Sequence, residues 1–124
     1  MFTRALDVRG LLELVAGAEP VRHAGDGLRV GHMHLHVGDL GAARAFYVDT
    51  LGFEVMASMP SALFLAVGGY HHYLGANTWR GEGVGPAPAG TVGLREWTIV
   101  LPAGAEEQVV DDPWGNRLRL AAAA

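Results

Sequence analysis

The strongest constraint on the fold lies in residues 31–39, GHMHLHVGD, where histidines alternate with apolar side chains. An alternation with a period of two predicts a β-strand, which we expect over residues 28–37. Its histidines then project from one face, and Met33, Leu35 and Val37 project from the other. We expect the apolar face to pack on a helix, so that the imidazoles line the opposite face of the sheet.

The residues after this strand predict one helix and three further strands. Asp39 is placed to cap a helix over residues 40–51, and Gly52 follows where a left-handed C-cap is typical. The spacing of apolar residues then predicts strands at 53–57, 62–67 and 70–77, with a tight turn at Gly68 and Gly69. The predicted order of elements is therefore β-α-β-β-β.

The two ends of the chain follow simpler patterns. Asp7 is placed to cap a short helix before a linker at residues 17–27. A glycine- and proline-rich loop at 80–92 precedes a strand at 94–101, and a turn at 112–116 leads into a last strand.

Composition narrows the classes of protein further. The 124 residues are 50% hydrophobic and 18% charged, which is typical of one small globular domain. The absence of cysteine excludes disulfides, thiolate metal sites and cysteine catalysis, and no apolar run is long enough to cross a membrane. A net charge of −4 argues against a nucleic-acid partner. Without a signal-like segment at its start, the chain is expected to be cytoplasmic.

Histidines are the main candidates for chemistry. Five of the six lie in two predicted strands, and imidazole is the commonest protein ligand for a metal. His71 and His72 are neighbours, so a strand would point them to opposite faces and only one would join a given site. Glu54 and Glu96 are the carboxylates within predicted strands. The simpler alternative is a solvated sheet face that carries histidines and an exposed strand glutamate.

Several stretches resemble one known superfamily. Residues 31–55, GHMHLHVGDLGAARAFYVDTLGFEV, are similar to the opening of vicinal-oxygen-chelate proteins, which include glyoxalases, bleomycin-resistance proteins and extradiol dioxygenases. DDPWGNRLRL at 111–120 is similar to the closing hairpin of that superfamily. The stretches GGYHHYLGANTW and GTVGLREWTIVLP resemble the C-terminal half of catechol-2,3-dioxygenase-like proteins.

The resemblance implies an α+β fold of two βαβββ modules, whose strands form a curved mixed sheet around a divalent metal. It places the vicinal-oxygen-chelate domain at residues 28–124, after an N-terminal helix and linker at 1–27. Module one then covers 28–79, and a partial module two covers 92–120.

The resemblance also assigns metal ligands by position. The first ligand position falls on His32. The second falls on Tyr73 or, one pleat earlier, on His71; we expect His71, because tyrosine is a poor ligand for a divalent ion. The third falls on Glu96, where the superfamily often has histidine. The fourth, usually a glutamate, is Arg119, which cannot ligate a metal.

Further roles follow from the same resemblance. His34 and His36 are the expected acid and base. Tyr73, Asn77, Trp79 and Arg119 are expected to contact a small aromatic or planar substrate. The expected metal is Fe²⁺ or Mn²⁺, with Zn²⁺ or Ni²⁺ as alternatives.

Three functions remain open at this stage. The histidine-rich face favours an extradiol dioxygenase that cleaves a catechol-type ring. Arg119 and the short connection at 102–111 favour a bleomycin-resistance-like binding protein without catalysis. A glyoxalase-type isomerase uses the same scaffold but normally has two carboxylate ligands. That connection leaves no room for the helix of a full second module. Because the chain resembles only the C-terminal half of its two-half relatives, we expect a homodimer to complete the sheet.

Overall fold

The structure is a computed structural model that describes residues 5–123. It contains two compact units, Met1–Val30 and Gly31–Ala124. No helix in the described part of the chain is both long and apolar enough to cross a membrane.

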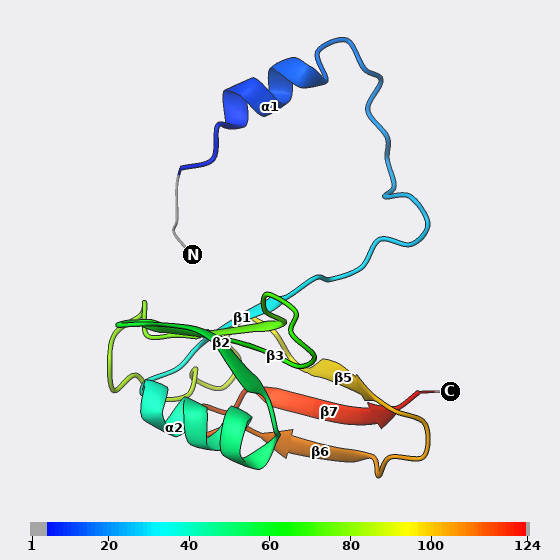
Figure 1. Cartoon of the computed structure of the whole chain (residues 1–124). Coiled ribbons are helices and arrows are strands. Elements are labelled where there is room, and N and C mark those ends of the chain that lie inside the picture. Colours follow the sequence, from blue (N-terminus) through cyan, green and yellow to red (C-terminus); the bar gives the residue numbers. More distant parts are fainter. Residues whose placement is uncertain (1–4, 124) are drawn as a thin grey trace. The chain divides into compact units, whose positions relative to one another are not determined.

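In residues 5–30, the described part of the first unit, the chain forms the short helix α1 (Val8–Leu14) (Figure 1). Asp7 is its N-cap, and the Asp7 carboxylate accepts a hydrogen bond of 2.9 Å from the Gly10 N–H. Such a bond satisfies one of the free donors at the start of a helix. The predicted helix and its cap are therefore confirmed.

The second unit begins with a βαβββ module on a four-stranded sheet (Figure 1). Its strand order is β1-β4-β3-β2; β1 runs parallel to β4, and the other neighbours are antiparallel. The helix after β1 begins as the α-helix α2 and continues as the π-helix η1. The bounds of these elements are β1 (Met33–His36), α2 (Leu40–Arg44), η1 (Ala45–Thr50), β2 (Glu54–Met59), β3 (Ala62–Ala66) and β4 (Leu74–Asn77).

Local signals in the sequence set the boundaries of this module. The Asp39 carboxylate accepts a hydrogen bond of 2.6 Å from the Ala42 N–H and so caps α2. Gly52 ends the helical segment with a φ of 80°, a conformation that favours glycine. Gly68 and Gly69 also have positive φ and form the turn after β3. These predicted signals are confirmed.

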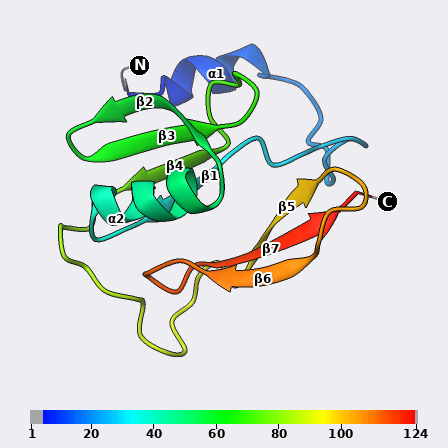
Figure 2. The same ribbon diagram turned by 60° about the horizontal axis from the view of Figure 1, so that its bottom comes forward.

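A three-stranded sheet forms the second module (Figure 2). Its strands are β5 (Trp97–Leu101), β6 (Gln108–Asp111) and β7 (Arg117–Ala122), in the order β5-β7-β6. Residues 102–107 connect β5 to β6 without a helix, as expected from their number. The α+β fold with a shortened second module is thus confirmed, and its strands are divided between two sheets.

Three predicted strands are shorter than expected. β1 starts at Met33 rather than at residue 28, β4 starts at Leu74 rather than at 70, and β5 starts at Trp97 rather than at 94. The parallel pairing of β1 with β4 begins at Met33 and Leu74, so the residues before them have no ladder to join. The start of each strand depends on its pairing with a neighbouring strand, and the alternation of residues within one strand does not reveal that pairing.

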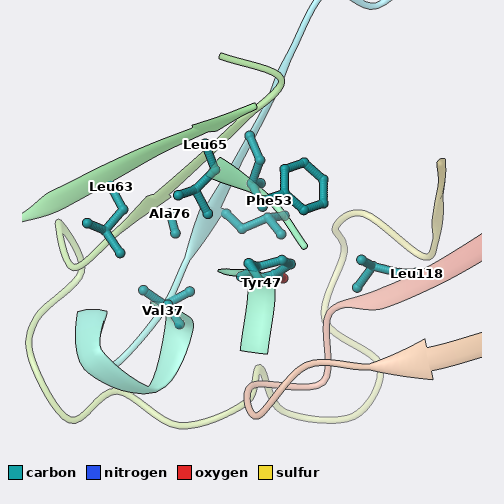
Figure 3. Packing of buried hydrophobic residues seen from close by; sticks show 10 residues of the cluster. Val37, Tyr47, Phe53, Leu63, Leu65, Ala76 and Leu118 are labelled. Carbon is teal, nitrogen blue, oxygen red and sulfur yellow. The ribbon is translucent and has the colours of Figure 1, made fainter. Parts of the chain in front are cut away.

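One hydrophobic core joins the two modules (Figure 3). Tyr47 of η1 is fully buried at its centre, with Leu65 of β3 and Leu118 of β7 in the same cluster. The structure buries Tyr47, and Phe46 is only partly buried. Trp114 is partly buried and packs against this core.

A buried carboxylate supports this junction. Asp112, 4% exposed, lies in the turn between β6 and β7 and accepts a hydrogen bond of 2.7 Å from the Tyr47 hydroxyl. It also accepts bonds from the Trp114 N–H and from the backbone and side-chain N–H groups of Asn116. Burial and the neighbouring Asp112 raise the pKa of Tyr47. The turn motif therefore fastens the second module to the helix of the first.

Candidate metal centre

The strand β1 separates its side chains as predicted. Leu35 is buried in the core beside the helix, whereas the histidines at 32, 34 and 36 are all exposed. Because side chains alternate along a strand, the imidazoles lie on the face of the four-stranded sheet that points away from the core. This surface is called the histidine face below.

Three histidines gather at one end of the histidine face. One ring nitrogen from each of His32, His71 and His72 lies within 4.8 Å of the other two. The ring centroids of His32 and His72 are 4.5 Å apart, and those of His71 and His72 are 4.6 Å apart. The expectation that only one of the two neighbouring histidines joins the site is wrong. Both precede β4, so the alternation of a pleated strand does not apply to them.

His72 is the most enclosed member of this cluster. The residue is only 7% exposed, and neither of its ring nitrogens has a hydrogen-bond partner among residues 5–123. Burial, followed by the neighbouring His32, His71 and His34, lowers the pKa of His72 below its usual 6.5. A neutral imidazole with a free nitrogen is the form that binds a metal. The arrangement therefore fits a divalent metal.

His34 lies beside the cluster and against the sheet. A side chain at Gly75, its pairing partner on β4, would come within 2.7 Å of the His34 ring, so the ring uses space that only glycine leaves. The Trp79 ring stacks on His34 at a centroid distance of 5.8 Å. Burial, followed by His32 and His36, lowers the pKa of His34. A largely neutral His34 is suited to accept a proton near neutral pH.

His36 is oriented by a buried amide. Its Nδ1–H donates to the Asn77 Oδ1 at 2.8 Å, and this oxygen also accepts a weaker bond from the Trp79 N–H at 3.3 Å. Asn77 is 1% exposed, so it is a fixed support rather than an open contact for a ligand. With Nδ1 engaged in this hydrogen bond, Nε2 is the ring nitrogen of His36 left for acid–base chemistry.

Aromatic side chains surround the histidines. Trp79 is 59% exposed, and Tyr73 and Tyr70 are stacked with their ring centroids 4.4 Å apart. Phe64 of β3 lies beneath His72, with a centroid distance of 5.0 Å. The accessible rings of Trp79 and Tyr73 are suited to stack on a flat ligand. The structure thus brings most of the predicted site residues to one face.

Glu96 and Arg119 lie elsewhere. The Arg119 guanidinium donates to both carboxylate oxygens of Glu96, at 2.8 and 3.2 Å, across the neighbouring strands β5 and β7. These hydrogen bonds with Glu96 raise the pKa of Arg119. Glu96 also precedes β5 instead of lying within it, and it is not in the metal-ligand cluster of the described residues. Glu54, the other candidate carboxylate, is exposed on β2.

Comparisons with known proteins agree with this architecture. Residues 29–68 match the family model described as bleomycin resistance protein-like N-terminal. This match, together with the two similar proteins described next, supports the resemblance to the vicinal-oxygen-chelate superfamily.

A curated relative is the catechol-2,3-dioxygenase of Bacillus subtilis (strain 168), which is 45% identical over 112 residues. The match covers 89% of this chain and 39% of the relative, so the chain spans about two-fifths of the length of that protein. The crystal structure of lactoylglutathione lyase from Agrobacterium tumefaciens has the same fold, with a TM-score of 0.57 at 18% identity. That match covers 79% of this chain and 96% of the other.

Proposed function

We propose that this chain is part of a metal-dependent, extradiol-type dioxygenase that cleaves a small aromatic diol. The observation that carries the proposal is the histidine cluster of His32, His71 and His72, which lies beside exposed aromatic rings. The similarity to a catechol-2,3-dioxygenase supports the same class of reaction.

The metal would be held by this cluster, with His32 and His71 as the ligands that the sequence predicts. When bound, a divalent metal supplies Lewis acidity and open coordination positions for the two neighbouring oxygens of a catechol-type substrate. Ring cleavage places both atoms of one dioxygen molecule in the product, so the reaction needs no added reductant. We expect Fe²⁺ or Mn²⁺ to support it.

The side chains around the cluster have separate tasks. Trp79 and Tyr73 stack on the flat ring and exclude water from its faces. His34 takes the proton from a substrate hydroxyl because burial favours its neutral form. His36 is the second acid–base group, and Asn77 holds its Nδ1 proton in place. Arg119 is held by Glu96 and binds substrate only if that pair opens.

The experiment is aerobic turnover of catechol by protein reconstituted with Fe²⁺ or Mn²⁺. We expect oxygen uptake together with absorbance from the ring-opened product. His34→Gln should lower kcat by about 100-fold, a typical acid–base contribution, and leave metal content unchanged. His23→Gln changes an exposed histidine of the first unit and is the matched control. A metal-loaded protein that consumes no oxygen would contradict the proposal.

A specific observation favours a second function, the binding of a planar molecule without catalysis. The ion pair between Glu96 and Arg119 joins two side chains at positions where the superfamily resemblance implies ligands. The match to a bleomycin resistance protein-like model also supports binding alone. Catechol binding without turnover in the experiment above would favour this function. A glyoxalase-type isomerase has less support, because the histidine cluster contains no carboxylate among residues 5–123.

We also propose that the protein is a homodimer. Among residues 5–123, β6 pairs only with β7, so the three-stranded sheet has an edge at β6 that a second copy can cover. Light scattering coupled to size-exclusion chromatography should give twice the chain mass. A monomer at high concentration would contradict this proposal.

A further inference from the structure

The two modules offer different groups to a metal. In the second module, the positions where the resemblance implies ligands hold Glu96 and Arg119, which form a two-pronged ion pair. An arginine stays protonated and has no free lone pair, so it cannot ligate a cation. Both oxygens of Glu96 already accept hydrogen bonds. Coordination by Glu96 would break this pair and leave a guanidinium next to a metal cation, which is electrostatically unfavourable.

The first module contains the opposite situation. His72 is buried, and both of its ring nitrogens lack a protein partner within the described chain. Buried polar atoms normally have a hydrogen-bond partner, and an unpaired one needs an explanation. One free nitrogen of His72 lies within 4.8 Å of nitrogens from His32 and His71. An ion shared by the three rings would satisfy one of the two unpaired nitrogens of His72.

The backbone explains how two neighbouring histidines reach the same point. Gly68 and Gly69 take positive φ values, and residues 70–73 then form an irregular segment before β4. Tyr73 fixes the end of this segment, because its N–H donates to the Leu65 carbonyl and its carbonyl accepts from the Met33 N–H, each at 2.8 Å. The segment therefore lies against the start of β1, next to His32.

We infer that the metal is held by three imidazoles of the first module, those of His32, His71 and His72, and that the second module supplies no ligand. The inference rests on the proposed function in one respect only, that a metal is bound at the histidine face. It assigns His72 as a ligand in place of Glu96. A neutral set of three nitrogens leaves the full positive charge on the ion, which favours an anionic oxygen ligand such as a catecholate.

The donor set also predicts metal preference. Imidazole suits Zn²⁺, Cu²⁺, Ni²⁺ and Fe²⁺, whereas Mn²⁺ prefers sites with carboxylate oxygens. We therefore expect Zn²⁺ and Ni²⁺ to bind more tightly than Mn²⁺. The difference in affinity should be larger here than at a site that includes a carboxylate ligand. A Cu²⁺-loaded sample should show nitrogen couplings from the imidazoles in its electron paramagnetic resonance spectrum.

The test is titration of the metal-free full chain with Zn²⁺, in competition with a chromophoric chelator. His32→Ala, His71→Ala and His72→Ala should each weaken Zn²⁺ binding by about 100-fold or more, because even the loss of a supporting contact to a ligand costs about 10- to 100-fold. Glu96→Gln and His23→Ala should leave the affinity unchanged. His32 and His71 are exposed, so their variants report on binding even if the buried His72→Ala variant fails to fold.

Each outcome decides the inference. Loss of affinity in Glu96→Gln to the extent seen in His32→Ala would overturn it, as would unchanged affinity in His71→Ala or in a folded His72→Ala. Absence of Zn²⁺ binding by the wild-type chain would also overturn it. Failure of the proposed function gives a different result: Zn²⁺ and Fe²⁺ bind through the three histidines, but catechol and oxygen are not consumed.

Discussion

The two modules carry very different side chains on similar strand frameworks. Each has a parallel pair of strands, β1 with β4 and β5 with β7, and a third strand antiparallel to the second of the pair. The first module presents three clustered imidazoles, and the buried His72 among them has no hydrogen-bond partner within the described residues. In the second module, Glu96 before β5 is bound to Arg119. Similar strand frameworks therefore hold a cluster of histidines in one module and an ion pair in the other, which illustrates how independently a fold and its site can vary.

The largest expected effect comes from breaking the connection between the modules. Asp112→Ala removes a buried carboxylate that accepts bonds from Tyr47, Trp114 and Asn116, and it should lower the free energy of unfolding by about 3 kcal/mol or more. Asp111→Ala is the matched control, because Asp111 is exposed and pairs only with Arg117 among the described residues. Chemical denaturation measures both. Equal stability of the two variants would show that the turn does not fasten the modules.

The next largest effect is expected on the histidine face, where Gly75 leaves space for the His34 ring. Gly75→Ala places a methyl group within 2.7 Å of the His34 ring, so it should displace that ring and destabilise the fold by about 1–3 kcal/mol. The stacking of Trp79 on His34 should loosen and change tryptophan fluorescence. Gly85→Ala is the control, since an added Cβ there meets nothing within 4 Å. An unchanged spectrum and melting temperature would refute this account of Gly75.

A smaller effect depends on pH and concerns only the first module. The pKa of His72 is lowered below 6.5 in the folded chain, so the unfolded chain takes up the proton more readily. The stability that His72 contributes is therefore complete above about pH 6.5 and is lost as the pH falls toward its folded pKa. In metal-free protein, His72→Gln should reduce the loss of stability between about pH 8 and about pH 5. An identical pH profile in both proteins would contradict this prediction.

The smallest effect is expected in the second module. Glu96→Gln and Arg119→Gln each open an exposed ion pair, and such pairs contribute little to stability because water and salt screen them. Thermal melts of both variants should match the wild type at physiological ionic strength. A marked loss of stability in either one would mean that the pair supports the sheet, and the contrast between the modules would then be weaker than proposed.

The sequence predicted the parts of this structure that depend on local patterns. The alternation around Leu35 identified the histidine face, and Asp39 and Gly52 marked the ends of the helix. These features follow from strand periodicity and helix capping, which act over a few residues. The order β-α-β-β-β, and the connection without a helix at residues 102–107, could likewise be predicted from the sequence.

The remaining features depend on contacts between distant segments. His71 and His72 were expected on opposite faces because their strand was predicted to be too long, and only the pairing of β4 shows where it begins. The glycine pair before them was a signal of irregular backbone that favours both histidines in one site. The pairing of Glu96 with Arg119 joins residues 23 apart in the sequence, and no local pattern reveals it.

The segment between β4 and β5 has a consequence for how the chain can be divided. Residues 78–96 form a long connection with several glycines, whereas Leu118 and Asp112 bind the second module to the helix of the first. The contacts that join the modules are thus independent of the peptide that links them. Two fragments made by cutting this connection should reassemble when mixed, and all three clustered histidines would come from the N-terminal piece.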